Sequence, residues 1–574
     1  MVLVSNELRV HSILCYNISM SAKTTLFLPE NTFYTHVTRA SNSLHVVGYN
    51  LLTKKKINEK IEFEPDLYFP TSNPTTNFKT ISGQPLQKRS FKNMAAAHKA
   101  ITNATAVAQS GVPCVFGQNR WVYQWIANTW GKNPVKYDAS LIRVAMLDIE
   151  TTTKYGFPDT KNPLEQIVVI TIKCGKTLKV FGLHPWQQDN KRCDLPPVDY
   201  VECHDEHELL EKFINFIIEL APDIITGWNT SYFDLPYIYN RIVKVFGDGN
   251  IEKGEEIANN LSPLNKCEVV ECFVNNRPAV KLVIDGIHTI DYLDLYKKFE
   301  LTPRADYKLE TIVEVELGKH KLDAGFNTYD EWYRNGWTSY VDYNIVDVLL
   351  IEQLDAAKKF LQLSYELVYG SYCMPGDVTS PIRLWDQIIW TTMIRDNVVI
   401  WISNNADRDA EDYEGGFVVQ TTPGKYGHIM SFDVASEYPH VMSQFSISPE
   451  NLEPVDELEA DRIVNACLKE YPQDVRKAMG QKFIEENDKS VLSEQTICKE
   501  TIITALIENK FDSLPLKEAN VTMAPSGILF KKKPGFLGKS VISYYHLRKA
   551  LNERIRVIEQ DIIPALESHL KTLG

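Results

Sequence analysis

The sequence lacks the patterns that mark several special classes of protein. None of its apolar runs is long enough to span a bilayer, and its first residues do not follow the charged, apolar and small-residue order of a signal peptide. Its ten cysteines include no CxxC pair, which argues against a structural zinc site and favours reduced thiols buried as small apolar groups. Internal repeats and low-complexity segments are also missing. We therefore expect a soluble intracellular protein with no membrane partner.

An excess of positive charge is lacking too, since the formal net charge is −13. This balance argues against a protein that coats nucleic acid nonspecifically, but it leaves room for basic groups along one channel beside acidic catalytic sites. The 574 residues are 44% hydrophobic and 24% charged, which is typical of globular proteins. They are too many for one hydrophobic core. The chain therefore predicts several domains.

The order of β-rich and helical segments predicts two kinds of domain. Between residues 32 and 137, short β-rich runs alternate with turn residues around one helix near 93–108, which indicates a mixed α+β domain. From residue 141 strands alternate with helices, the pattern of an α/β domain. Strands are expected over 143–149, 166–172 and 223–226, and helices over 206–221, after Asp234 and over about 341–363.

Asp148 and Glu150 form the first candidate site. They lie two residues apart on an expected strand, so both carboxylates project from one face while Leu147 and Ile149 point into the core. Two hard oxygen donors on a rigid face suit Mg²⁺ or Mn²⁺. An edge strand with two exposed acids is the alternative, and the pair alone does not decide between them.

Two later clusters add to this pair. The segment from Asn229 to Asp234 follows an expected strand, where α/β sheets place ligands, although Asn and Asp also favour turns and helix caps. Tyr343 and Asp347 are four residues apart and share a helix face, for which an amphipathic helix with an exposed acid is the alternative. Carboxylates from three segments beside a phenol suit two-metal hydrolysis of a phosphodiester, in which the phenol orients the attacking water.

The three clusters resemble a known set of motifs. Asp148-Ile149-Glu150-Thr151, the NxxxFD segment ending at Asp234 and the YxxxD segment ending at Asp347 are similar, in this order, to the three proofreading motifs of the 3′–5′ exonuclease domain of family B DNA polymerases. Flanking residues such as Thr226-Gly227-Trp228-Asn229 look like the polymerases of large tailed bacteriophages. The resemblance implies a ribonuclease H-like domain that acts on a single-stranded DNA 3′ end with two Mg²⁺ (or Mn²⁺) ions. If a phage encodes the chain, it also implies the cytoplasm of an infected bacterium.

The resemblance implies roles for single residues as well. Tyr343 would position the attacking water, and Asn229 would contact DNA. Lys319 would be a basic helper near the DNA, with an ordinary surface lysine as the alternative. The metal-site acids would be Asp148, Glu150, Asp234 and Asp347.

The implied architecture is α/β and multidomain. An extension of unknown role covers 1–29, a mixed α+β amino-terminal domain covers 30–142 and is completed by 360–404, the exonuclease domain covers 143–359, the first part of the palm covers 405–534, and the first fingers helix covers 535–574.

A fourth acidic cluster resembles half of a polymerase site. The segment around Asp433 is similar to motif A of the family, in which Asp433 would bind the catalytic metals while Ser436 and Tyr438 would bind the nucleotide. Asp433 would end an apolar strand over 428–432, with a turn aspartate as the alternative. Arg548 matches the fingers arginine that pairs with the triphosphate, although a solvated helix face also explains it.

Two family patterns have no counterpart in the 574 residues. These are KxxxNSLYG of the second fingers helix and YxDTDS, which carries the second palm acids. Glu437 and His440 also depart from the usual motif A. We therefore expect the amino-terminal part of a replicative polymerase that takes primer-template DNA and dNTP but needs a second polypeptide for template-directed synthesis. A stand-alone 3′–5′ exonuclease and a non-catalytic nucleic-acid-binding remnant are the alternatives.

Overall fold

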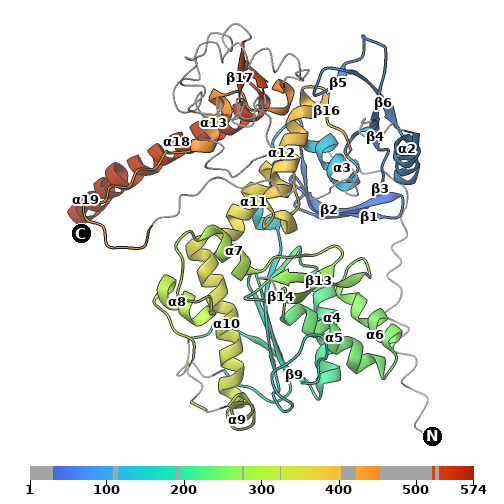
Figure 1. The fold of residues 1–574 in the computed structure, drawn as a ribbon. Coiled ribbons are helices and arrows are strands. Elements are labelled where there is room, and N and C mark those ends of the chain that lie inside the picture. The colour runs from blue at the N-terminus through green and yellow to red at the C-terminus, as the bar shows by residue number, and fades with distance from the viewer. Residues whose placement is uncertain are drawn as a thin grey trace. The chain divides into compact units, whose positions relative to one another are not determined.

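The structure is a computed structural model whose described part forms two compact units (Figure 1). One unit takes in the chain up to Thr80 and Gln84–Ser403, and the other takes in Ile81–Gly83 and Asn404–Gly574. The predicted extension over 1–29 and most of the predicted palm lie outside the described residues. Within these residues no helix is both long and apolar enough to cross a membrane. The structure describes residues 30–107, 114–188, 194–274, 277–322, 325–326, 328–402, 422–452, 520–523 and 529–573.

Two sheets form the amino-terminal part of the first unit. A three-stranded antiparallel sheet has the order β1-β2-β3, and a five-stranded sheet has the order β16-β5-β6-β4-β7. β16 (Val398–Val399) pairs in parallel with β5 (Phe78–Thr80), so the chain returns to this sheet after the α/β domain. The expected helix near 93–108 is confirmed as α2 (Met94–Val107). The remaining elements are β1 (Thr32–Ala40), β2 (Ser43–Asn50), β3 (Lys56–Glu62), β4 (Asp66–Pro70), β6 (Pro85–Ser90), β7 (Phe116–Gly117) and α3 (Trp121–Trp130).

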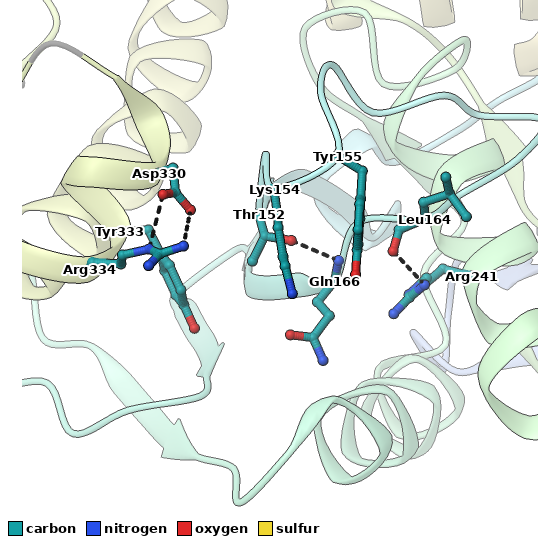
Figure 2. A pocket seen from close by; sticks show the side chains of 9 residues that line it. All are labelled: Thr152, Lys154, Tyr155, Leu164, Gln166, Arg241, Asp330, Tyr333 and Arg334. Atoms are coloured by element: carbon teal, nitrogen blue, oxygen red, sulfur yellow. Dashed lines mark hydrogen bonds and ion pairs between the residues drawn. The ribbon is translucent and has the colours of Figure 1, made fainter.

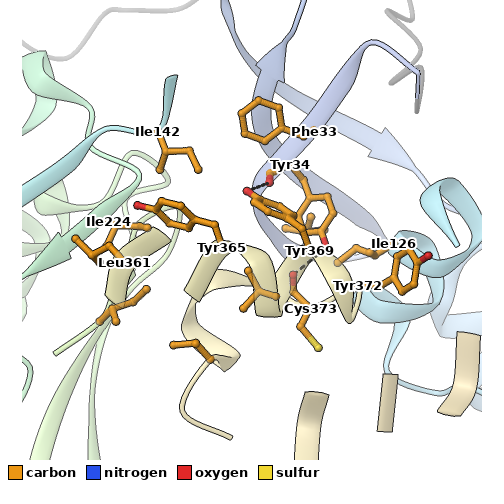
Figure 3. Packing of buried hydrophobic residues seen from close by; sticks show 14 of the residues in the cluster. Phe33, Tyr34, Ile126, Ile142, Ile224, Leu361, Tyr365, Tyr369, Tyr372 and Cys373 are labelled. Carbon is orange, nitrogen blue, oxygen red and sulfur yellow. Dashed lines mark hydrogen bonds between the residues drawn. The ribbon is translucent and has the colours of Figure 1, made fainter. Parts of the chain in front are cut away.

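A cluster of buried aromatic rings joins β1 to α11 (Phe360–Gly370) (Figure 3). The rings of Tyr34 and Tyr369 meet edge to face at 5.5 Å. The Tyr34 hydroxyl donates to the Cys373 carbonyl, and the Tyr369 hydroxyl donates to the Tyr34 carbonyl, each at 2.8 Å. Each phenol thus finds an acceptor inside the core, so burying these rings leaves neither hydroxyl unpaired.

The α/β domain is built on a six-stranded sheet with the order β11-β10-β9-β8-β12-β15. β8 (Val144–Thr151) lies inside the sheet, antiparallel to β9 (Ile167–Cys174) and parallel to β12 (Ile224–Thr226). These three strands confirm the expected ones, with ends shifted by no more than two residues. The other strands are β10 (Thr177–Gly182), β11 (Asp199–Glu202) and β15 (His288–Thr289), and β13 (Cys267–Val274) pairs with β14 (Arg277–Ile284) in a separate hairpin.

Helices cover both faces of the six-stranded sheet (Figure 1). α10 (Trp337–Lys358) packs on one face against β8 and β9, and α4 (Glu206–Leu220) packs on the other against β9 and β10. Side chains of β8 alternate accordingly, since Leu147 and Ile149 are buried in the core with α4 while Asp148 contacts α10. The domain also contains α5 (Asp234–Gly247), α6 (Ile251–Ala258), α7 (Tyr292–Phe299), α8 (Leu309–Leu317) and α9 (Tyr329–Asn335).

The prediction of one helix over about 341–363 is wrong, because two helices cover these residues. α10 ends at Lys358 and α11 begins at Phe360, because Lys359 adopts a left-handed conformation with φ 57°. The Asp355 carboxylate fixes this break by accepting the Leu361 N–H at 3.0 Å. Apolar spacing continues across the break, so periodicity alone did not reveal it. α12 (Pro381–Arg395) follows α11.

Two packed helices are the main described elements of the second unit. α13 (Glu437–Gln444) packs against α18 (Phe536–Val557), where the rings of His440 and Tyr545 lie 4.8 Å apart. α18 continues through a π-helical turn (Ile558–Ile562) into α19 (Ile563–Leu573). The helix expected near the carboxy-terminal end is thus confirmed as a helix. A short hairpin of β17 (Val521–Met523) and β18 (Leu529–Lys531) completes the described part.

The strand expected over 428–432 is wrong. No regular element covers these residues, and no described strand pairs with them. Ile429 and Phe432 are 74% and 86% exposed. An apolar run becomes a strand only where a neighbouring strand satisfies its backbone groups, and the described residues offer none here.

Candidate active site

Two carboxylates project from β8 toward α10. The Asn344 amide of α10 donates to Asp148 Oδ2 at 2.6 Å. Tyr340, one turn earlier on the same helix, donates its hydroxyl to the Thr151 carbonyl at 3.0 Å and also lies within hydrogen-bonding reach of Glu150. The alternation of side chains along β8 therefore places both acids on the face of the sheet that α10 covers.

A third carboxylate reaches the same place from the start of α5. Asp234 is 4% exposed, and its Oδ1 accepts the Ile149 N–H of β8 at 3.3 Å. The turn before α5 is fixed by Asp291, whose two carboxylate oxygens accept the backbone N–H groups of Asn229 and Ser231 at 3.0 and 2.9 Å. Asn229 itself is exposed and left-handed, with φ 67°, a conformation that asparagine tolerates.

α10 supplies the fourth carboxylate and the phenol. Asp347 is 5% exposed and forms an ion pair with Lys321. The Lys321 ammonium also donates to the Tyr343 hydroxyl at 3.0 Å and lies 4.9 Å from the centre of that ring. Tyr343 and Asp347 thus meet one cation, as their spacing of four residues on one helix face allows.

The lysine beside the acids is Lys321 rather than Lys319. Lys319 Nζ donates to Gln353 Oε1 at 2.6 Å on the exposed surface. Lys321 is two residues later and largely buried between Tyr343 and Asp347. The structure therefore places Lys321, and not Lys319, in contact with Tyr343 and Asp347.

The acids raise one another's pKa values. Burial is the largest cause for each, followed at Asp148 by repulsion from Asp234, Glu150 and Asp347. The pKa of Asp148 is well above its usual range, that of Glu150 is raised to about 8, that of Asp234 to about 7 and that of Asp347 to about 6. Lys321 opposes these shifts but is one cation against four carboxyl groups. The cluster therefore favours further positive charge.

The donor set fits a divalent cation in its chemistry. Carboxylate oxygens are the ligands that Mg²⁺ and Mn²⁺ prefer, and the buried Asp347 Oδ1 has no hydrogen-bond partner among the described residues. The same residues contain no group of three or more His, Cys, Asp or Glu side chains already arranged as a metal cage. The acids would therefore have to adjust their side chains to share an ion.

Three residues of this site were not predicted from the sequence. Lys321 lies in the basic segment that drew attention to Lys319, and only its contacts distinguish the two. Asn344 directly follows Tyr343, so its position on the helix could have suggested a second polar contact to β8. Asp291 follows strand β15, and a position after a strand was the signal that drew attention to the segment from Asn229 to Asp234.

The residues of the predicted polymerase half-site lie in the second unit. Asp433 and Tyr438 are exposed, the latter by 82%. Ser436 precedes α13 with a left-handed φ of 55°. Arg548 is exposed on α18. Packing of α13 on α18 brings these two helices together, but no described contact joins the four side chains.

A family model matches the part of the chain that holds three of the four acids. A sequence model of the exonuclease domain of DNA polymerase family B matches residues 129–312. This range holds Asp148, Glu150 and Asp234, while Tyr343 and Asp347 lie beyond it.

Relatives extend the similarity along the chain. A DNA-directed DNA polymerase of Escherichia phage RB69 is 32% identical over 422 residues, which cover 68% of this chain and 44% of the relative. A DNA-directed DNA polymerase of Enterobacteria phage T4 is 28% identical over 442 residues, covering 71% and 47%. A DNA polymerase of Archaeoglobus fulgidus is 24% identical over 314 residues, covering 54% and 34%. The chain thus spans about half the length of the phage relatives that it matches.

Proposed function

The chain carries an exonuclease domain of the family B DNA polymerases, and we propose that this domain removes nucleotides from the 3′ end of single-stranded DNA. The observation that carries the proposal is the convergence of Asp148, Glu150, Asp234 and Asp347 in one buried cluster with Lys321. Such a cluster costs stability unless it serves a cation, since buried like charges repel. Exonuclease domains of this family generally use divalent metal ions, in agreement with this reasoning.

The four acids would hold two Mg²⁺ or Mn²⁺ ions. When bound, such ions activate a water and stabilise the leaving oxygen of a phosphodiester. Tyr343 would orient that water, because burial raises the pKa of its phenol far above the usual range and keeps it protonated at neutral pH. Its oxygen already accepts from Lys321, so its own O–H remains a donor toward Asp347 or the water. Asn344 holds Asp148 in place.

Digestion of a labelled single strand tests this function. We expect Mg²⁺-dependent shortening from the 3′ end, and we expect Asp148→Ala to slow it by at least about a hundredfold. Asp199→Ala is the matched control, because Asp199 is an exposed acid on β11 of the same sheet, and it should keep the rate. Equal rates for Asp148→Ala and the unchanged protein, or digestion that chelation does not stop, would exclude the proposed site.

We further propose that the second unit contributes half of a polymerase site. Asp433 would hold catalytic metal, and Ser436, Tyr438 and Arg548 would contact the incoming dNTP on primer-template DNA. The 574 residues contain no YxDTDS or KxxxNSLYG segment, so acids and a lysine from outside them would complete this site, and we propose that a second polypeptide supplies them. An exposed apolar stripe along α18 and α19 supports such a partner, with spacing of three or four residues that is typical of helix pairing. It consists of Tyr544, Leu547, Leu551, Ile555, Ile558, Ile562 and Leu566.

Primer extension separates this proposal from a stand-alone exonuclease. The 574-residue chain alone should digest a primer but not extend it when dNTPs are present. Template-directed extension by the purified chain would contradict the need for a second polypeptide. Digestion without extension, even after addition of a polypeptide that carries both missing motifs, would favour the stand-alone exonuclease.

A further inference from the structure

A pocket of about 570 Å³ lies between the segment that follows β8 and α9 (Figure 2). Its volume is in the range of small-ligand sites. The loop after β8 forms one wall, and α9 stands across from it. The residues that line it are Thr152, Lys154, Tyr155, Leu164, Gln166, Arg241, Asp330, Tyr333 and Arg334.

A short chain of contacts links this pocket to the acids. Thr152 is two residues after Glu150 on the same segment. Across the pocket, the ring of Tyr333 lies 6.1 Å from that of Tyr340, and Tyr340 in turn reaches Thr151 and Glu150. A molecule in the pocket would therefore sit one residue layer from the carboxylates.

The loop wall is built rigidly. Glu165 is 2% exposed, and its carboxylate accepts the Thr152 hydroxyl at 2.5 Å, the Lys154 N–H at 3.0 Å and the Tyr155 N–H. This one buried acid thus fixes three of the four positions from Thr152 to Tyr155 in the wall of the pocket. Because its partners are loop groups, the loop is held in place without any ligand, which lowers the cost of binding one.

A second buried acid fixes the far end. Glu206 is paired with Arg241 by two hydrogen bonds of 2.7 and 2.6 Å. The same guanidinium donates to the carbonyls of Pro163 and Leu164 at 2.9 and 3.2 Å. Arg241 is therefore neutralised and occupied, so it shapes the pocket rather than offering free charge.

Lys154 is the cation in the lining of the pocket that is not paired with an acid among the described residues. Three cations line it, but Glu206 neutralises Arg241, and Asp330 neutralises Arg334 through contacts of 3.0 and 3.2 Å. Lys154 has no acidic partner among the described residues, and its ammonium lies 5.2 Å from the centre of the Tyr155 ring. This one ammonium without an acidic partner favours an anionic ligand.

The remaining walls suit a flat polar ring. Tyr155 is 67% exposed, so one face of its ring is available for stacking. The Gln166 side chain has no hydrogen-bond partner among the described residues, and its amide can donate to and accept from a base edge. In Figure 2 Lys154, Tyr155 and Gln166 lie side by side, with Tyr333 and Arg334 across from them.

We propose that this pocket is a nucleotide subsite of the exonuclease that binds a nucleoside 5′-monophosphate. Its phosphate would meet Lys154 and its base would stack on Tyr155. The inference rests on the proposed function, because hydrolysis joins water oxygen to phosphorus, releases the 3′ oxygen of the preceding nucleotide with a proton, and yields this kind of molecule beside Glu150. The nucleotide in the pocket is either the released one or one still in the strand.

Equilibrium binding of dAMP to the full chain in EDTA tests the pocket without any need for catalysis. We expect a Kd on the order of 1 mM or tighter, weakened about tenfold by Lys154→Ala and by Tyr155→Ala, and largely retained in Lys154→Arg. Deoxyadenosine should bind more weakly than dAMP and should not respond to Lys154→Ala. Lys253→Ala, on the exposed surface of α6, is the matched control and should bind like the unchanged protein. No saturable dAMP binding, or equal binding by Lys154→Ala, would overturn the proposal.

Digestion kinetics then identify the source of the nucleotide. A higher inhibition constant for dAMP in Lys154→Ala, with KM for the oligonucleotide unchanged, assigns the pocket to the released mononucleotide. A higher KM with the inhibition constant unchanged assigns it to a nucleotide in the strand. The two proposals fail separately, since digestion without dAMP binding removes only the subsite, and dAMP binding without digestion removes only the exonuclease.

Discussion

Lys321 forms an ion pair with Asp347, and in this position its ammonium is the cation that opposes the raised pKa values of the buried acids. We expect Lys321→Met to lower the exonuclease rate by about ten- to a hundredfold, because Tyr343 and Asp347 lose the contact that holds them together. Removal of the charge also raises the pKa values of Asp148 and Glu150 further. The acidic limb of the pH–rate profile should therefore move to higher pH, as measured by digestion rates between pH 5 and 9.

Lys319→Met is the control for this experiment. Lys319 is two residues away and has its own contact with Gln353 on the exposed surface. Its replacement should leave both the rate and the position of the acidic limb within about twofold of the original, as surface substitutions generally do. A larger effect of Lys319→Met than of Lys321→Met would contradict the assignment of the basic group.

Metal-free protein should lose stability as the pH rises. The folded-state pKa values of Glu150, Asp234 and Asp347 are raised to about 8, 7 and 6, whereas carboxyls of an unfolded chain titrate near 4. Between these limits the folded state binds more protons than the unfolded one, so the free energy of unfolding falls from about pH 4 to pH 8. In EDTA, the melting temperature should drop over this window.

Divalent metal should reverse that loss. A cation that binds only the folded state raises the melting temperature, and we expect a rise of several degrees with Mg²⁺ or Mn²⁺ at pH 8. Asp234→Asn should melt higher than the unchanged protein in EDTA at pH 8 and respond less to metal, since one charge of the cluster is gone. A calorimetric scan in which metal shifts both proteins equally would argue against the acids as its site.

Much of the fold follows from patterns in the sequence, and the exceptions have physical causes. Leu147 and Ile149 alternate with Asp148 and Glu150. This alternation predicted both the strand and its two faces, because successive side chains of a strand point to opposite faces of the sheet. Residues 428–432 carry an equally apolar run but form no strand, since strand formation depends on a partner far away in the chain. A local pattern states what a segment can bury and not what it will pair with.

The same limit applies to the site. Acids of β8, α5 and α10 could be grouped from the sequence because their types and order form a motif. Whether Lys319 or Lys321 lies beside the acids depends on which of the two side chains points inward from the loop after α8. The residue type does not distinguish them, because both are lysines. Asp291 escaped notice for another reason. It accepts the backbone N–H groups of Asn229 and Ser231. A contact to a backbone group does not depend on the residue type of the partner, so the sequence does not show it.

A buried histidine pair in the first unit should oppose the gain in stability that the acids give on acidification. Gly286 N–H donates to His36 Nε2 at 3.1 Å, so His36 is neutral with its proton on Nδ1, which faces His288 Nε2 at 3.1 Å. Burial lowers the pKa of His36 to about 4. An unfolded histidine titrates near 6.5, so the unfolded state binds more protons between pH 6.5 and 4. The contribution of His36 to stability should therefore fall as the pH drops through this window, by about 2 kcal/mol at pH 5, against the gain that the acidic cluster gives over the same range.

Urea unfolding at pH 7.5 and pH 5 measures this contribution as a difference between variants. His36→Gln should be less stable at pH 7.5, because it lacks the ring contacts, but its change in stability on going to pH 5 should be about 2 kcal/mol more favourable than that of the unchanged protein. His98→Gln, at an exposed position of α2, should keep the original pH dependence. If the histidine pair plays no part, the stability of all three proteins will change by the same amount between the two pH values.

The buried pair of Glu206 on α4 and Arg241 on α5 should be far more sensitive to single substitution than a surface pair on α4. Arg241→Met leaves the Glu206 carboxylate, 5% exposed, without its two charge-assisted bonds, and removing one partner of a buried ion pair costs about 3–5 kcal/mol. Lys212→Met breaks the exposed i,i+4 pair with Glu208 on α4 and should cost no more than about 0.5 kcal/mol. Replacement of both buried partners by leucine removes the unpaired charge and should recover part of the loss. Urea midpoints for the four proteins decide the question, since equal losses for Arg241→Met and Lys212→Met would mean that Arg241 does not hold the carbonyls of Pro163 and Leu164 against the sheet.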